Sequence, residues 1–235
     1  TLYHIKYCIA AYGSALLNLC GYGNGIKVGS QLTGSLSLFF LRQEDAVRLQ
    51  SDRKVVCDVF KLDPDLDLIT WQYDKNRIFK PKYFVVRDPH TNCIVVVVRG
   101  TFSLQDAMTD LLCEYEPYKG GLAHRGVIRS AEWIVDRSFE AIKNAVARFN
   151  AAGINCVGHS LGGAVASLVC LMIHDRIGEL AELTSSPEFR VRAYSIGSPP
   201  WASRDLAEQA GPLVTAVVNE ADLVPRLSFG NVTLM

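Results

Sequence analysis

The later half of the chain alternates between short strand-like runs and longer helix-like stretches, and this alternation most constrains the fold. Apolar residues at helical spacing predict helices over 127–149, 161–176 and 203–209. Short runs containing β-branched residues predict strands over 154–157, 191–195 and 213–218. Consecutive strands joined by helices form right-handed crossovers and lie parallel in one sheet. The sequence therefore predicts an α/β fold with a central, mostly parallel sheet flanked by helices.

The earlier half adds two helices and a hairpin. Helical spacing predicts helices over 3–19 and 43–60. Residues 82–87 and 93–99 predict two strands joined by a turn. Because residues 94–98 are uninterrupted Ile and Val, the second strand is expected to be covered on both faces.

Composition excludes several classes of protein. The chain has 235 residues, of which 49% are hydrophobic, so a sizeable core is expected and intrinsic disorder is excluded. Its 24 basic residues balance its 24 acidic residues, which removes the electrostatic basis for binding nucleic acid. We therefore expect residues 1–235 to form a single domain without a nucleic-acid partner.

Cysteine usage and hydropathy bear on location. The seven cysteines are scattered, form no C-x-x-C pair, and in several cases lie inside apolar runs, as Cys93 and Cys170 do. This pattern predicts reduced, buried thiols in a cytosol-facing protein. No run reaches the roughly 20 apolar residues that span a membrane. The sequence as given therefore predicts a soluble domain.

The segment Gly158-His-Ser-Leu-Gly-Gly163 gives the sharpest chemical signal. It follows the strand predicted over 154–157 and precedes the helix predicted over 161–176, which is the context of a G-x-S-x-G nucleophile elbow. Such a turn strains the serine backbone and places the hydroxyl at a helix N-terminus, where the dipole favours negative charge. Ser160 is therefore predicted to be a nucleophile.

A serine nucleophile needs oxyanion donors and an acid that orients a base. The backbone N–H of Leu161 is one donor by position, and Thr101, at the exit of the strand over 93–99, is the second candidate. Asp222 follows the strand over 213–218 and fits the Ser, Asp, His order of α/β-hydrolases. Glu220, in the same loop, is its competitor.

Taken together, these motifs resemble the successive signatures of class 3 lipases, most closely those of sn-1-specific diacylglycerol lipases. The segments that carry the resemblance are 98–101, 106–110, 124–126, 158–163 and 222–226. The resemblance implies an α/β-hydrolase that cleaves a glycerolipid acyl ester through an acyl-enzyme at Ser160, at a membrane or lipid interface. It further implies Asp222 as the triad acid, Thr101 and Leu161 as the oxyanion hole, residues 102–121 as a lid, and no metal or other cofactor.

Three departures from this family pattern leave alternatives open. The relatives carry membrane-spanning helices ahead of the hydrolase domain and a long insertion within it, and neither is seen here, since only residues 178–188 separate helix from strand. None of the five histidines follows Asp222, so the base is expected beyond Met235, on a segment that the sequence lacks. His159 is expected to point away from Ser160 and pack against the fold, and His124 is not expected to be the base.

The leading hypothesis is thus a membrane-associated acylglycerol lipase on the cytoplasmic side. A non-catalytic lipid-binding module without the base, or another serine esterase such as a phospholipase A1, are the alternatives. On either view, residues 1–235 alone are expected to hydrolyse esters poorly, because the loss of one triad member lowers the rate by orders of magnitude.

Overall fold

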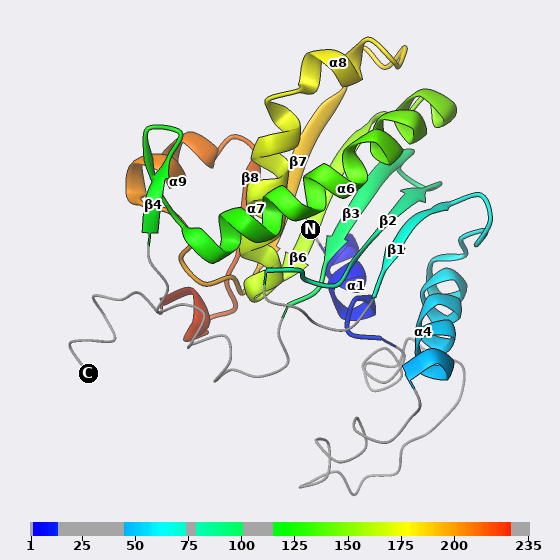
Figure 1. Cartoon of the computed structure of the whole chain (residues 1–235), viewed down its shortest axis with the longest axis horizontal. Helices are drawn as coiled ribbons and strands as arrows, with labels where there is room; N and C mark the ends of the chain where they lie inside the picture. The colour runs from blue at the N-terminus through cyan, green and yellow to red at the C-terminus, as the bar shows by residue number, and fades with distance from the viewer. Residues whose placement is uncertain (1, 14–44, 74–78, 101–114, 227–235) are drawn as a thin grey trace, which may run out of the picture.

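A six-stranded sheet forms the centre of the molecule (Figure 1). The computed structural model describes residues 2–13, 45–73, 79–100 and 115–226. The strand order is β1-β2-β3-β6-β7-β8, and β2 alone runs against the other five. The strands are β1 (Leu68–Gln72), β2 (Tyr83–Asp88), β3 (Cys93–Val98), β6 (Gly153–His159), β7 (Arg190–Ile196) and β8 (Val214–Val217). The α/β architecture predicted from the sequence is confirmed.

Helices cover both faces of this sheet. On one face lie α6 (Arg125–Phe149), α7 (Leu161–His174), α8 (Ile177–Ala181) and α9 (Arg204–Ala210), and on the other lie α1 (Leu2–Ala10) and α4 (Asp45–Phe60). The central strand β3 shows why two layers are needed. Its residues alternate between the faces, with Val96 and Val98 in the first core and Val95 and Val97 in the second, and none is exposed. The prediction of a strand covered on both faces is confirmed.

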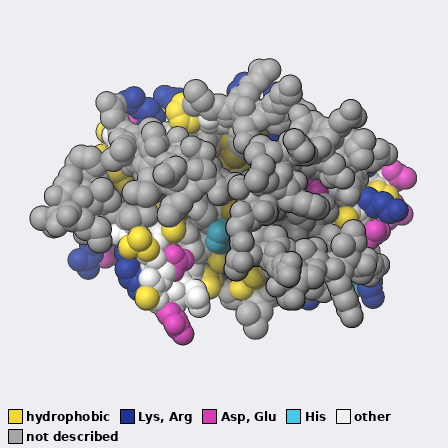
Figure 2. All heavy atoms as spheres, turned by 90° about the horizontal axis from the view of Figure 1, so that it is seen from below, with side chains coloured by type: hydrophobic (Ala, Val, Ile, Leu, Met, Phe, Trp, Pro, Cys, Tyr) yellow, Lys and Arg dark blue, Asp and Glu magenta, His cyan; other side chains and the backbone are white. Residues whose placement is uncertain are grey.

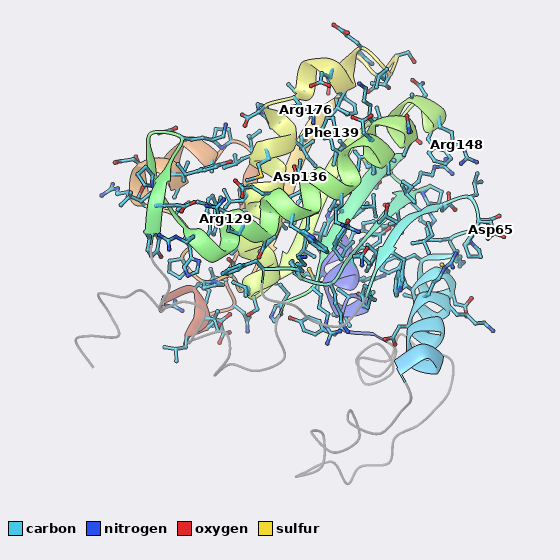
Figure 3. All side chains as sticks on the ribbon, in the orientation of Figure 1. Asp65, Arg129, Asp136, Phe139, Arg148 and Arg176 are labelled. Atoms are coloured by element: carbon cyan, nitrogen blue, oxygen red, sulfur yellow. The ribbon has the colours of Figure 1, made fainter. Side chains whose placement is uncertain are left out.

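The long helix α6 packs along α7, and a cation–π contact marks the far end of this pair. The Arg176 guanidinium lies 3.4 Å from the ring centroid of Phe139, and Figure 3 shows the two side chains facing each other. At the end of α6, Arg87 and Arg148 lie 5.1 and 5.0 Å from the ring of Phe149. These contacts join the helices α6 and α7 to each other and to β2. They lie at the edge of the sheet where its parallel strands begin.

The structure differs from the predicted elements in a few places. The helix predicted over 3–19 ends at Ala10, and Gly13 adopts a φ of +91°, where a Cβ would lie 2.7 Å from the Asp52 carboxylate oxygens. A left-handed residue stops an α-helix, so the prediction was wrong for residues 11–13, and 14–19 lie outside the described residues.

Some short elements were not predicted at all. These are β1, the helix α8, the one-turn helix η1 (Val224–Arg226), and a hairpin formed by β4 (Tyr115–Tyr118) and β5 (Gly121–His124). The hairpin includes the end of the lid predicted over 102–121, while residues 102–114 lie outside the described part. None of the helices that the structure describes is both long and apolar enough to cross a bilayer.

Candidate active site

The turn between β6 and α7 has the geometry of a nucleophile elbow. Ser160 has a φ of 55° and a ψ of −135°, an unfavourable conformation for a residue with a side chain. Its N–H donates a hydrogen bond of 2.9 Å to the carbonyl of Ile196 at the end of β7. The strain is therefore held in place by the neighbouring strand, as a preorganised nucleophile requires.

Two glycines make this sharp turn possible. A Cβ on Gly158 would lie 2.1 Å from the carbonyl oxygen of Gly162, and a Cβ on Gly162 would lie 2.4 Å from that of Val98. Both obstacles are backbone atoms, so no side chain can move aside. The glycine pattern that identified the elbow in the sequence is therefore a steric requirement of the fold.

The elbow presents Ser160 at the start of a helix and at the carboxyl edge of the sheet. Its side chain makes no capping hydrogen bond to α7, so the hydroxyl is not engaged by its own helix. The N–H of Leu161 belongs to the first helical turn, where backbone donors have no acceptor within the helix. In Figure 1 this edge lies at the lower end of the sheet, and Figure 2, seen from below, shows histidine, acidic and hydrophobic side chains on the described surface there.

The exit of β3 lies against Ser160. A Cβ on Gly100 would be 3.3 Å from the Cβ of Ser160 and 2.4 Å from the carbonyl oxygen of His159. Thr101, the second predicted oxyanion donor, follows directly but lies outside the described residues. Its role stays a prediction, which the placement of Gly100 supports.

Asp222 lies close to the elbow. One oxygen of its carboxylate, Oδ2, lies 3.0 Å from the point at which a Cβ of Gly197 would stand, and Nε2 of His159 lies 3.6 Å from the same point. The other oxygen, Oδ1, accepts a hydrogen bond of 3.0 Å from the N–H of Val224, which fixes the carboxylate. Its competitor Glu220 is exposed in the same loop.

His159 occupies a more polar setting than the sequence suggested. Its ring reaches solvent, and Nδ1 is 2.8 Å from the hydroxyl of Tyr12. The protein atoms around the ring lower the pKa of His159, and the negative charge of Asp222 opposes this shift in part. The expectation that His159 packs against the fold is therefore corrected, and Tyr12 is a neighbour of the site that sequence reasoning missed.

The remaining histidines have other places. His124 is buried at the start of α6, where Nδ1 accepts a hydrogen bond of 3.4 Å from the N–H of Val127 and caps the helix. His4 stacks on Tyr194 with ring centroids 3.8 Å apart, and His174 is the last residue of α7. Within the described ranges, no group of three or more His, Cys, Asp or Glu side chains could hold a metal ion.

Comparison with known proteins agrees with this geometry. Residues 95–232 match the family described as Lipase (class 3). Mouse diacylglycerol lipase-beta is 31% identical over 166 residues, which cover 66% of this chain and 23% of that protein. A lipase of Rhizopus niveus is 31% identical over 63% of this chain and 38% of its own length. The chain thus spans about a quarter to two fifths of the length of these relatives.

Solved structures show the same fold. The Rhizomucor miehei triacylglyceride lipase has a TM-score of 0.59 at 24% identity, covering 74% of this chain and 64% of that chain. Another, described as a triacylglycerol lipase with a serine protease triad as its catalytic centre, has a TM-score of 0.61 at 25% identity, covering 75% of this chain and 64% of that chain. With its α/β-hydrolase fold and a family match over more than half its length, the chain belongs to the class 3 lipase family.

Proposed function

We propose that this chain supplies the nucleophile and the acid of a serine-dependent acylglycerol lipase, with a diacylglycerol-type lipid as substrate. The observation that carries the proposal is the strained Ser160 at the start of α7, with the Asp222 carboxylate beside the end of β6. Family membership and the named relatives, two of which are a diacylglycerol lipase and a fungal lipase, support the substrate class.

In the proposed reaction, the Ser160 hydroxyl attacks the ester carbonyl while a histidine takes its proton. The N–H groups of Leu161 and Thr101 stabilise the resulting oxyanion, and the histidine gives its proton to the leaving oxygen as the intermediate collapses, which releases the glycerolipid alcohol and leaves an acyl-enzyme. Water then attacks the acyl carbonyl while the histidine takes a proton from it, and return of that proton to the Ser160 oxygen frees the fatty acid. Asp222 orients the histidine, which we expect beyond Met235.

The substrate meets this site at a lipid surface. Residues 102–121, which include the β4 strand, are proposed to form a lid that opens there, and the protein is proposed to act on the cytoplasmic side of a membrane. The exposed Tyr115, near the end of this segment, and the exposed Leu122, directly after it, offer apolar surface on the β4–β5 hairpin. Apolar side chains of this kind enter a lipid interface without a net charge.

A mass-spectrometric assay of fatty-acid release tests the proposal. The natural polypeptide that carries these residues should hydrolyse diacylglycerol in mixed vesicles, and Ser160→Ala should abolish hydrolysis. Asp222→Asn should lower kcat by about 10²- to 10⁴-fold, whereas Glu220→Gln, in the same loop, should leave it nearly unchanged. Full hydrolysis by Ser160→Ala would refute the proposal.

Two other functions are distinguished by the same assay. A plant phospholipase A1 from Arabidopsis thaliana is 27% identical over 65% of this chain, so phosphatidylcholine is the competing substrate to include. A non-catalytic lipid-binding module would bind the vesicles with no release of fatty acid from any lipid. If the catalytic histidine lies beyond Met235, the isolated chain 1–235 should be a poor catalyst for every one of these substrates.

A further inference from the structure

Tyr12 places a buried hydroxyl between the exit of β3 and the nucleophile elbow. It follows α1, which packs against β3 and β6 (Figure 1). Its hydroxyl lies within hydrogen-bond distance of Nδ1 of His159, 2.8 Å away. A Cβ on Gly100 would be 2.5 Å from this hydroxyl and 3.3 Å from the Cβ of Ser160. The Tyr12 hydroxyl therefore lies next to the backbone of Gly100, on which Ser160 also packs.

The direction of this hydrogen bond depends on which ring nitrogen of His159 carries the proton. The negative charge of Asp222 favours a proton on the nitrogen nearer to it, Nε2, which leaves Nδ1 to accept from the Tyr12 hydroxyl. A neutral imidazole that accepts at Nδ1 carries its own proton on Nε2. That Nε2 lies on the side of Gly197 where Oδ2 of Asp222 also lies. The N–H of the imidazole and the negative carboxylate thus occupy the same small region.

The phenol ring is held from several sides. The Arg99 guanidinium lies 5.7 Å from its centroid, and the His159 ring meets it edge-on at 5.7 Å. The backbone before it is fixed as well, because the buried Tyr73 hydroxyl donates a hydrogen bond of 2.7 Å to the carbonyl of Ala11. Tyr12 is thus anchored, and only 7% of it is exposed.

We infer that Tyr12 is a positioning residue: its hydroxyl, packed against Gly100 at the exit of β3, donates to Nδ1 of His159 and fixes that imidazole as the Nε2–H tautomer beside Asp222. Because the same hydroxyl lies against Gly100, the contact holds the exit of β3 and the β6–α7 turn in one arrangement. The catalytic consequence rests on the proposed function, whereas the tautomer of His159 does not.

Nitrogen NMR of the imidazole rings tests the contact without any need for activity. In chain 1–235 labelled at histidine, His159 should show a protonated Nε2 and a Nδ1 shifted by a strong hydrogen bond, with His159→Gln identifying its signals. Tyr12→Phe should move the Nδ1 resonance toward that of an unbonded imidazole nitrogen. Tyr3→Phe is the matched control, because this tyrosine of α1 donates its hydroxyl to Asp88, 3.0 Å away on β2. An unchanged Nδ1 resonance in Tyr12→Phe would overturn the inference.

Kinetics of the natural polypeptide then test the consequence. Loss of one buried hydrogen bond should lower kcat about 10-fold in Tyr12→Phe, with little change in KM, while Tyr3→Phe should retain full kcat. If Tyr12 acts through His159, the Tyr12→Phe, His159→Gln double variant should be no slower than His159→Gln alone.

The failures of the two proposals can be told apart. If Ser160→Ala remains active, the proposed function fails, and the NMR result still decides the Tyr12 contact. If hydrolysis depends on Ser160 but Tyr12→Phe keeps full kcat or loses no more than Tyr3→Phe, the positioning role alone is refuted.

Discussion

The substitution Gly162→Ala probes how closely the elbow approaches the central strand. Its Cβ would lie 2.4 Å from the carbonyl oxygen of Val98 and 2.7 Å from the nitrogen of Gly100. Ordinary contact begins at 3.4 Å, so α7 and the exit of β3 would have to separate by about 1 Å, the difference between 3.4 and 2.4 Å. Both partners are backbone, so the added methyl strains the fold rather than rotating a side chain.

The expected magnitude follows from two opposing effects. Overpacking costs about 1–3 kcal/mol, and more where nothing can yield, while alanine gains up to about 1 kcal/mol over glycine in a helix. We expect Gly162→Ala to lower the free energy of unfolding by about 2 kcal/mol, which lowers Tm by about 4–8 °C in a chain of this size.

Urea unfolding followed by circular dichroism measures this change. Gly178→Ala on α8 is the matched control, because an added Cβ there meets nothing within 4 Å. It should raise the free energy of unfolding by about 0.5–1 kcal/mol, since only the helix propensity changes. If Gly162→Ala proved as stable as the wild type, the close approach of α7 to β3, and the steric argument for the elbow, would be refuted.

Three further predictions concern groups away from Ser160. Burial lowers the pKa of His4 from 6.5 to about 4, so the unfolded chain binds its proton first as the pH falls. Stability should be greatest above pH 6.5 and decrease by about 2 kcal/mol between pH 6.5 and 4, and urea titrations of His4→Phe should show a smaller decrease. His124→Ala should destabilise the chain by at least about 1 kcal/mol through the lost α6 cap, and His124→Asn by less, as thermal unfolding would show; equal losses would contradict the capping role. Cys156 and Cys170 are fully buried, and the hydrogen bond between their side chains together with burial raises the pKa of the Cys156 thiol. Peptide mapping after brief treatment with iodoacetamide should find both unmodified until denaturant is added, and rapid native alkylation would contradict this packing.

Much of the fold could be predicted because its signals are local. The uninterrupted apolar run of β3 and the helical periodicity of α6 and α7 each depend only on neighbours in the sequence. The β1 strand and the β4–β5 hairpin escaped prediction because they are short and carry no strong pattern. All five residues of β1 are only partly buried, as befits a strand at the edge of the described sheet.

The candidate site likewise has a part that the sequence could predict and a part that it could not. Ser160 and its glycines were recognisable because the elbow is one continuous segment whose steric demands fix the residue types. Asp222 could be proposed from its place after a strand, but its approach to His159 required β6, β7 and β8 to assemble side by side.

The sequence by itself determined an α/β chain with a nucleophile elbow, since periodicity and close backbone contact leave their marks on adjacent residues. Only the tertiary structure decided that Tyr12 meets His159 and that His159 is a polar neighbour of Asp222 rather than a packing residue. The Tyr12 contact joins positions 147 residues apart. Such a contact exists only after α1 has packed against β3 and β6, because burial of the apolar helix, not any local pattern, carries the phenol to the elbow.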